Sequence, residues 1–216
     1  MREKLIIIGG GEHARVVAEA AHSRPDLWDL QGFVERKPCP RIEQESGLAC
    51  LGTGEDASFL ACAATSTWFV LGVGGIGPST IRRDLIRRYA AAGNKWASII
   101  HSTAHVSPSA TVGKGVVILS GVVVNCGAVL GDHCVINSGA VIEHDVRVGS
   151  FVQVSTGSVI GGGAVLEEDC YVGLGARVRD HVTVGSGAMV GMGAAVVATV
   201  PMGLTVVGVP ARVRKQ

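Results

Sequence analysis

A six-residue spacing of aliphatic side chains runs through the second half of the chain. From Ile100 to Val196, every sixth residue is isoleucine, leucine or valine. This spacing differs from the 3.6-residue period of an amphipathic helix and from the two-residue alternation of an ordinary strand. Hexapeptide periods are typical of a chain wound into a parallel β-helix. The other positions of this aliphatic column are Val106, Val112, Ile118, Val124, Leu130, Ile136, Ile142, Val148, Val154, Ile160, Leu166, Val172, Val178, Val184 and Val190.

A second column, made of small side chains, accompanies the aliphatic column. Four residues after each aliphatic residue, the chain carries alanine, valine, cysteine or serine. One large and one small inward residue on each flat face would fill a narrow prism at the density of a protein interior. The small column comprises Ala104, Ala110, Val116, Val122, Ala128, Cys134, Ala140, Val146, Val152, Ser158, Ala164, Cys170, Ala176, Val182, Ala188, Ala194 and Val200.

The first hundred residues follow a different pattern. An apolar run at residues 5–8 predicts a strand, and the helix expected after it would carry Val16, Val17, Ala20 and Ala21 on one face. The alternation of apolar strands with amphipathic helices is typical of a small α/β unit with a parallel sheet.

Further elements of the same kind lead up to the repeats. Residues 30–34 and 67–73 predict two more strands. Ser79 is placed to cap a helix that ends at Ala92, and Gly93 would stop it. We therefore expect strand, helix, strand, strand and helix before the chain enters the β-helix.

Composition supports this division into two parts. The chain has 216 residues, of which 47% are hydrophobic but only 4% aromatic, as in an aliphatic core rich in β structure. We expect a Rossmann-like α/β half-domain over residues 1–98 and an all-β parallel β-helix with a C-terminal tail over residues 99–216. The net charge of +1 gives no reason to expect a nucleic-acid partner. The sequence has no leader pattern and no apolar run of membrane-spanning length, which argues against secretion and a membrane span.

The cysteines and a group of arginines are interpreted as structural. The cysteines form no C-x-x-C pair, so we interpret them as reduced core residues of a cytoplasmic protein. The arginines on the second expected helix are interpreted as a solvated face. The cysteines are Cys39, Cys50, Cys62, Cys126, Cys134 and Cys170, and the arginines are Arg82, Arg83, Arg87 and Arg88.

The turn after the first strand matches a dinucleotide-binding pattern. Residues 9–14, Gly-Gly-Gly-Glu-His-Ala, fit G-x-G-x-x-A, and the acidic Glu35 follows at about the distance of such sites, roughly 20 residues on. Taken alone, the match predicts NAD, but the unit is too short for the two mononucleotide halves of a complete site. Backbone N–H groups at such a turn also suit the diphosphate of a nucleotide-sugar. A third interpretation is that the glycines only keep the turn close.

One repeat carries chemistry that the others lack. His144 lies between Glu143 and Asp145 and two residues after an inward aliphatic, so it should face outward. A neighbouring carboxylate can fix the imidazole tautomer and raise its basicity, which suits a general base. His133 and His181 also follow acidic residues, and residue chemistry alone leaves all three histidines open. No group of residues shows the ligand spacing of a zinc site.

Four segments together carry a family resemblance. The glycine-rich turn with its histidine, the entry to the repeats at residues 100–104, the segment 136–145 and the ending Gly-Val-Pro-Ala at 208–211 resemble those of a group of sugar acetyltransferases. This group contains sialic acid O-acetyltransferases and the N-acetyltransferases that make bacillosamine and perosamine derivatives. The resemblance covers essentially the whole chain. It implies a left-handed β-helix of triangular section, three hexapeptides per coil, and a homotrimer.

The resemblance also implies an active site. Acetyl-CoA would lie in the cleft between the β-helices of two adjacent subunits. His144 would be the general base that takes a proton from the acceptor. Asp145, where related bacillosamine enzymes carry glutamate, would raise the basicity of His144, and Asn137 would lie near the acceptor group. Residues expected to contact acetyl-CoA are Gln153, which replaces a histidine of some relatives, Leu174 and Met192.

The remaining implied residues would bind the substrate. Gly11, Glu12 and His13 match the loop that holds the nucleotide-sugar, and Gly74 matches a second turn beside it. Relatives that bind UDP-sugars often carry two aspartates where this chain has Glu35 and Arg36. An arginine there changes the charge near the base or ribose, which argues against UDP and leaves another nucleotide or an unactivated sugar open.

These observations favour a cytoplasmic acetyltransferase that uses acetyl-CoA and no metal. The expected reaction is direct N-acetylation of a nucleotide-linked 4-amino-4,6-dideoxysugar. O-acetylation of sialic acid or a related sugar is the alternative within the enzyme class. Outside this class, a non-catalytic trimeric nucleotide-binding scaffold and an NAD-dependent enzyme stay open.

Overall fold

The chain divides into two compact units. A computed structural model describes residues 2–37, 40–55 and 67–214. The first unit comprises Met1–Gly75 and Ser79–Ser102, and the second comprises Ile76–Pro78 and Thr103–Gln216. The division therefore falls at residue 102, with the short segment 76–78 belonging to the second unit, whereas sequence analysis placed it at residue 98.

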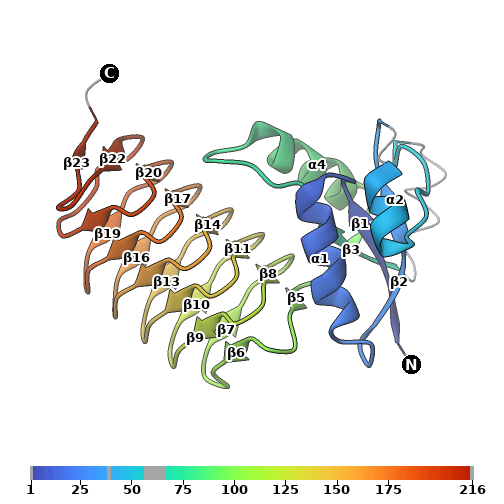
Figure 1. The fold of residues 1–216 in the computed structure, drawn as a ribbon, viewed down its shortest axis with the longest axis horizontal. Coiled ribbons are helices and arrows are strands. Elements are labelled where there is room, and N and C mark those ends of the chain that lie inside the picture. Colours follow the sequence, from blue (N-terminus) through green and yellow to red (C-terminus); the bar gives the residue numbers. More distant parts are fainter. Residues whose placement is uncertain (1, 38–39, 56–66, 215–216) are drawn as a thin grey trace. The chain divides into compact units, whose positions relative to one another are not determined.

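The first unit is built on a parallel four-stranded sheet with the order β2-β1-β3-β4 (Figure 1). The strands are β1 (Glu3–Ile8), β2 (Trp28–Val34), β3 (Thr67–Leu71) and β4 (Lys95–Trp96). The strands are buried toward their C-terminal ends, at residues 5–8 of β1, 32–34 of β2 and 69–71 of β3, as expected for parallel strands that are covered on both faces.

The helices of this unit are α1 (Glu12–His22), α2 (Pro40–Ser46) and α4 (Thr80–Ala91). In α1, Val17, Ala20 and Ala21 are buried as predicted. Val16 is 39% exposed, so its assignment to the buried face was wrong. The apolar stripe instead includes Ala14, three residues before Val17 and one helical turn away.

The other helices differ in how well the sequence predicted them. Ser79 is the N-cap of α4 and its side chain accepts a hydrogen bond from the Arg82 N–H, which confirms the predicted start. α4 ends at Ala91 with Ala92 as its C-cap, and Gly93 has a positive φ. Sequence analysis did not predict the short helix α2. β5 (Ile99–Ile100) ends the first unit.

The second unit is a left-handed parallel β-helix of two-residue strands, coloured green to red in Figure 1. Each strand pairs with the strand 18 residues further on, as Val141 does with Val159, so one coil consists of three hexapeptides. Its strands are β6 (His105–Val106), β7 (Thr111–Val112), β8 (Val117–Ile118), β9 (Val123–Val124), β10 (Val129–Leu130), β11 (Val135–Ile136), β12 (Val141–Ile142), β13 (Arg147–Val148), β14 (Gln153–Val154), β15 (Val159–Ile160), β16 (Val165–Leu166), β17 (Tyr171–Val172), β18 (Arg177–Val178), β19 (Thr183–Val184), β20 (Met189–Val190) and β21 (Ala195–Val196).

The strands stack into three flat faces. One face has the order β19-β16-β13-β10-β7, and another has the order β21-β18-β15-β12-β9-β6. The third face runs from β20 through β17, β14 and β11 to β8. Beyond β20 it continues into β22 (Thr205–Val207) and β23 (Arg212–Val213). β23 pairs antiparallel with β22, so the stack of parallel coils ends in a hairpin.

Both predicted columns fill the interior of the prism. From Ile118 to Val196, no aliphatic-column residue is more than 3% exposed, and the same holds for the small column from Val116 to Val200. Val106 and Val112, in the first coil, are only partly buried. The interior is therefore a continuous stack of large and small side chains, and the sequence period corresponds directly to the shape of the coil.

The cysteines only partly follow the prediction. Cys134 and Cys170 are buried in the small column, but Cys50 and Cys126 are exposed, so those two were wrongly assigned to the core. All four are free thiols, and the other two cysteines, Cys39 and Cys62, lie outside the described residues.

Loss of one core side chain should destabilise the β-helix much more than loss of an outward one on the same face. Leu166→Ala removes a fully buried side chain of β16 and should lower the free energy of unfolding by about 2–5 kcal/mol. Val129→Ala, on β10 of that face and 39% exposed, should cost only about 0.5 kcal/mol. Denaturant unfolding of both variants measures the difference, and similar losses would contradict the assignment of the aliphatic column to the interior.

Candidate active site

His144 lies at a corner of the β-helix, between β12 and β13. Ile142, the last residue of β12, points into the core, and the next residues turn the corner. Asp145 has a φ of 60°, in the left-handed region that non-glycine residues seldom adopt. Because the corner projects from the prism, the His144 side chain is 55% exposed and open to a ligand.

The two predicted catalytic residues are in contact. His144 Nδ1 lies 3.0 Å from Asp145 Oδ2. This hydrogen bond is the main reason that the pKa of His144 is raised above its ordinary value, and the charges of Asp145, Glu143 and Asp180 raise it further. In the neutral imidazole, the bond to the carboxylate favours a proton on Nδ1, which leaves the Nε2 lone pair available to accept another.

Residues from the neighbouring coils complete the surroundings of His144. Gly162 lies one coil further on, and a Cβ atom added to it would stand only 2.6 Å from His144 Nε2. The N–H of Gly162 donates to Asp180 Oδ1 at 3.0 Å, and the Asn125 side chain donates to Glu143 Oε2 at 2.9 Å. The corner is therefore fixed by hydrogen bonds across coils, and the missing side chain of Gly162 leaves the space that the imidazole occupies.

The competing histidines have different surroundings. His133 is buried and its ring stacks on Phe151 with 5.5 Å between centroids, so its environment is that of a packed residue. His181 is exposed at the same corner as His144, with its Nδ1 against the backbone at Gly163. Of the three candidates, His144 combines an exposed side chain with a hydrogen-bonded carboxylate.

The residues expected to contact acetyl-CoA fall into two groups. Leu174 and Met192 lie 18 residues apart, at one corner in successive coils, and both are largely exposed. Gln153 is buried, and its Nε2 donates to the Gly77 carbonyl at 3.3 Å, so it holds the segment 76–78 within the second unit. Leu174 and Met192 thus present an apolar strip to a ligand, whereas the Gln153 amide already has a partner. Asn137, at the corner after β11, is partly buried.

The glycine-rich turn and Glu35 form a second cluster, in the first unit. Gly9 has a φ of 105°, and Gly10 donates its N–H to Glu35 Oε2 at 2.9 Å. The next residue, Gly11, is the N-cap of α1 and is exposed, as is Glu12 in the first helical turn. One of the turn's amides is therefore already bound to a carboxylate from the end of β2 and is not open to a phosphate in this arrangement.

His13 is held in its neutral form. Burial, and secondly the charge of Arg82, lower the pKa of His13 to about 4. Gly74 lies beside it, since an added Cβ atom would be 3.0 Å from the His13 Cβ. The structure thus brings these two predicted substrate-binding residues together, and the imidazole beside Gly74 is uncharged.

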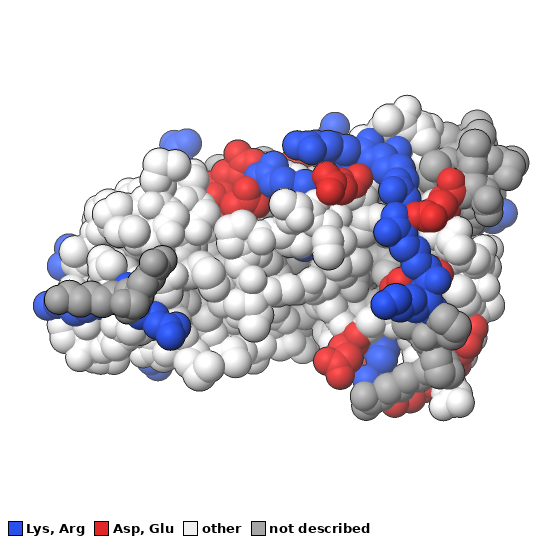
Figure 2. Space-filling model, turned by 90° about the horizontal axis from the view of Figure 1, so that it is seen from above, with Lys and Arg blue, Asp and Glu red and all other residues white. Residues whose placement is uncertain are grey.

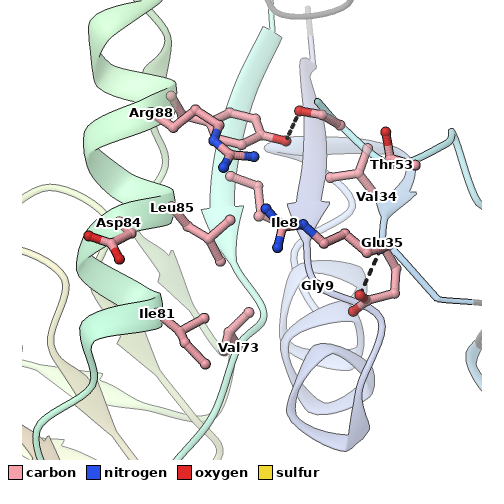
Figure 3. Close-up of a pocket in the computed structure, with 13 residues that line it drawn as sticks. Ile8, Gly9, Val34, Glu35, Thr53, Val73, Ile81, Asp84, Leu85 and Arg88 are labelled. Atoms are coloured by element: carbon pink, nitrogen blue, oxygen red, sulfur yellow. Dashed lines mark hydrogen bonds between the residues drawn. The ribbon is translucent and has the colours of Figure 1, made fainter. Parts of the chain in front are cut away.

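A pocket of about 350 Å³ opens beside the glycine-rich turn (Figure 3). Ile81 and Leu85 of α4 form one side, while Val34 and Glu35 at the end of β2 form the other. Arg36 and Arg88 contribute positive charge to the lining, and Asp84 contributes negative charge.

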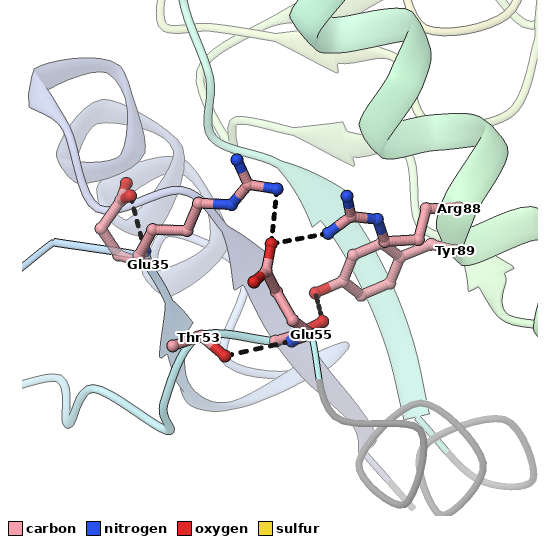
Figure 4. Close-up of polar contacts among 7 residues, drawn as sticks. Glu35, Thr53, Glu55, Arg88 and Tyr89 are labelled. Atoms are coloured by element: carbon pink, nitrogen blue, oxygen red, sulfur yellow. Dashed lines mark hydrogen bonds and ion pairs between the residues drawn. The ribbon is translucent and has the colours of Figure 1, made fainter.

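Two arginines beside this pocket share one carboxylate (Figure 4). Arg88 Nη1 donates to Glu55 Oε1 at 2.8 Å, and Arg36 Nη2 contacts the same oxygen. Hydrogen bonds from both arginines hold the pKa of Glu55 below its ordinary value. The Tyr89 hydroxyl donates to the Gly54 carbonyl at 3.0 Å, which ties the loop before Glu55 to α4.

Sequence analysis missed most of these pocket residues and misassigned one arginine. Arg82 is buried, so its assignment to a solvated face was wrong, whereas Arg88 is exposed as predicted and also lines the pocket. Glu55 gave no local signal, because its partners lie 19 and 33 residues away in the chain. Gly162 and Asp180 do have a signal, because both lie in the sequence column of His144 at steps of one coil.

Other features of the described residues bear on cofactors and partners. Among these residues, no group of three or more histidine, cysteine, aspartate or glutamate side chains is arranged to hold a metal ion. No helix in the described ranges has the length and apolarity needed to cross a bilayer. In the view of Figure 2, basic and acidic side chains lie next to one another on the surface.

The contact between His144 and Asp145 predicts a measurable titration. We expect the pKa of His144 to lie above the ordinary histidine value, and Asp145→Asn to lower it by removing the main cause of the shift. NMR titration of the imidazole measures both values. Asp132→Asn, at a different corner, is the control and should leave the His144 pKa in place. An unchanged His144 pKa in the Asp145 variant would contradict the contact.

The space at Gly162 predicts a coupling with His144. Gly162→Ala should destabilise the protein only modestly, because its Cβ atom would overlap the exposed end of the imidazole, which can move aside. In a His144→Ala background the same change should cost much less. A double-mutant cycle of unfolding free energies measures the difference. Equal costs in the two backgrounds would show that the imidazole does not occupy this space.

Comparison with known proteins places this geometry in context. The PglD N-terminal domain family matches residues 4–89. A mutant of perosamine N-acetyltransferase from Caulobacter crescentus, solved with CoA and GDP-perosamine, is 30% identical, with 99% of this chain and 97% of that chain covered and a TM-score of 0.85. The acetyltransferase domain of PglB from Neisseria gonorrhoeae, solved with acetyl coenzyme A, is 33% identical, with 99% and 100% covered and a TM-score of 0.87. WeeI from Acinetobacter baumannii, at 21% identity and a TM-score of 0.81 over 99% of this chain and 100% of its own, shares the fold.

Proposed function

The chain belongs to the hexapeptide-repeat sugar acetyltransferases, and on this premise we propose that it acetylates the amino group of a nucleotide-linked 4-amino-4,6-dideoxysugar. It is an acyltransferase, and acetyl-CoA is its acyl donor. The observation that carries the proposal for the site is the exposed His144 imidazole, hydrogen-bonded to Asp145 at a corner of the β-helix. The GDP-perosamine bound by a relative that aligns with nearly the whole chain supports the proposal of a sugar acceptor.

In the proposed reaction the acetyl group passes directly to the acceptor. The amine nitrogen attacks the thioester carbonyl carbon while His144 Nε2 takes a proton from it. As the C–N bond forms and the C–S bond breaks, CoA leaves as a thiolate, which receives the proton from the imidazolium. Asp145 stabilises that imidazolium, and its hydrogen bond keeps Nε2 as the basic atom.

The proposal assigns the substrates to the two parts of the chain. Residues 1–98 would bind the nucleotide-sugar through Gly11, Glu12, His13, Glu35, Arg36 and Gly74. Residues 99–216 would bind acetyl-CoA in a homotrimer, with Leu174 and Met192 as an apolar contact and Asn137 near the acceptor. Gln153 would act indirectly, by holding the segment 76–78. We further propose that the enzyme works in the cytoplasm, where acetyl-CoA is available.

Replacement of His144 should abolish turnover but not donor binding. His144→Ala should lower kcat by about 10²–10⁴-fold, the usual contribution of a general base. The dissociation constant for acetyl-CoA should stay unchanged. Release of CoA thiol is measured with UDP-, GDP- and dTDP-linked 4-amino-4,6-dideoxysugars and with sialic acid. His181→Ala is the matched control, because that exposed histidine lies at the same corner and should retain activity.

The outcomes separate the candidate functions. A loss of less than tenfold in the His144 variant would remove its role as base. Turnover on sialic acid alone would replace N-acetylation with O-acetylation. If the protein bound a nucleotide-sugar but did not bind acetyl-CoA, it would be a scaffold.

A further inference from the structure

The pocket of the first unit has three chemically different zones (Figure 3). Apolar side chains, among them Val34, Ile81 and Leu85, line opposite sides and suit the faces of a flat ring. Glu35 supplies a carboxylate, while Arg36 and Arg88 supply guanidinium donors. A nucleoside has the matching parts, which are a flat base, a ribose diol and acceptor atoms on the edge of the base.

The carboxylate zone is positioned for hydroxyl groups. Glu35 Oε2 accepts the N–H of Gly10 at 2.9 Å, and Oε1 accepts the N–H of Arg36 at 2.7 Å. These backbone bonds fix the carboxylate at the end of β2, where α/β nucleotide sites place the acid that binds ribose. A carboxylate has about four acceptor positions, so two backbone donors leave it able to accept ribose hydroxyls.

The arginine zone is preorganised by Glu55. Both guanidinium groups contact the same oxygen of this carboxylate, one from the end of β2 and the other from α4 (Figure 4). Each guanidinium has five N–H donors in a fixed fork, so one contact to Glu55 leaves several for a ligand. Because Glu55 restrains both side chains, less conformational entropy is lost when they bind an acceptor.

The donor edge discriminates among bases. Guanine presents two adjacent acceptors, O6 and N7, which an arginine fork engages with two parallel hydrogen bonds. Adenine replaces O6 with an amino donor, which would face the guanidinium donors unfavourably. Uracil and thymine present O4 without a neighbouring N7, so they offer one acceptor instead of two.

We propose that this pocket binds the guanosine part of a guanosine diphosphate-linked sugar, with Arg36 and Arg88 donating to guanine O6 and N7 and Glu35 accepting from the ribose hydroxyls. The inference rests on the proposed function, since it names the nucleotide of the acceptor. It also gives a physical role to the arginine that follows Glu35 in this chain.

Binding of free nucleotides to the full chain tests the proposal. Calorimetric titration with GDP, UDP and ADP should give a dissociation constant for GDP about tenfold or more below the other two, as expected for one good bidentate contact. Arg36→Gln and Arg88→Gln should each reduce this preference to severalfold or less. Arg15→Gln is the matched control, because it removes an arginine–glutamate pair between α1 and α2 of the same unit, outside the pocket lining.

Three results would overturn the proposal. These are equal binding of GDP and ADP, a preference for UDP, and an arginine variant that weakens all three nucleotides equally, which would place the arginines on the diphosphate. Thermal unfolding of each variant confirms that it folds.

The CoA-release assay separates this inference from the proposed function. Turnover that depends on His144 with a UDP-linked sugar would keep the acetyltransferase and reject guanine. Guanine-selective binding without turnover on any amino-sugar would do the reverse.

Discussion

Close packing inside a narrow prism is the constraint on which the rest of this structure depends. In each coil, a flat face can bury only one large and one small side chain. Both columns must repeat without a slip for successive coils to pair. A shift of one residue would turn the inward side chains of a strand outward, so the register is strongly fixed. All functional side chains of the second unit are therefore confined to outward positions, and their heights along the helix follow from the 18-residue coil.

The corners are where this constraint leaves freedom for chemistry. One residue per corner takes a left-handed conformation, and most such positions in the helix are glycine. Asp145 adopts that conformation without the freedom of glycine, and this costs on the order of 1 kcal/mol of backbone strain. The strain aims its carboxylate at His144 Nδ1. His133, Phe151, Asp169 and His181 take the same conformation at other corners, so the conformation belongs to the coil, and only the contact with His144 distinguishes Asp145.

The sequence predicted the parts of the fold that have a local or periodic cause. The hexapeptide columns, the cap at Ser79 and the contact of His144 with its sequence neighbour all follow from short-range patterns. Gly162 and Asp180 were also within reach, because steps of 18 from His144 lead to both. The contacts of Gln153 and Glu55 were not within reach. The partner of Gln153 lies 76 residues away in the chain, and those of Glu55 lie 19 and 33 residues away. Contacts of that kind depend on tertiary structure, which no window of the sequence contains.

The glycine-rich turn shows why a motif needs its surroundings before it names a ligand. Taken alone, the G-x-G-x-x-A pattern and the acid at the end of β2 predict NAD, against which the short length of the unit argued, and the structure does bring the two into contact, through Gly10 and Glu35. That contact fixes the turn and the carboxylate, but it is compatible with any ribonucleotide. In our proposal the choice among ligands is made further out, where Glu55 holds the donor groups of Arg36 and Arg88 beside the pocket. In the proposed site the backbone pattern would set the position of a nucleoside, while side chains from separate elements would determine which base it can carry.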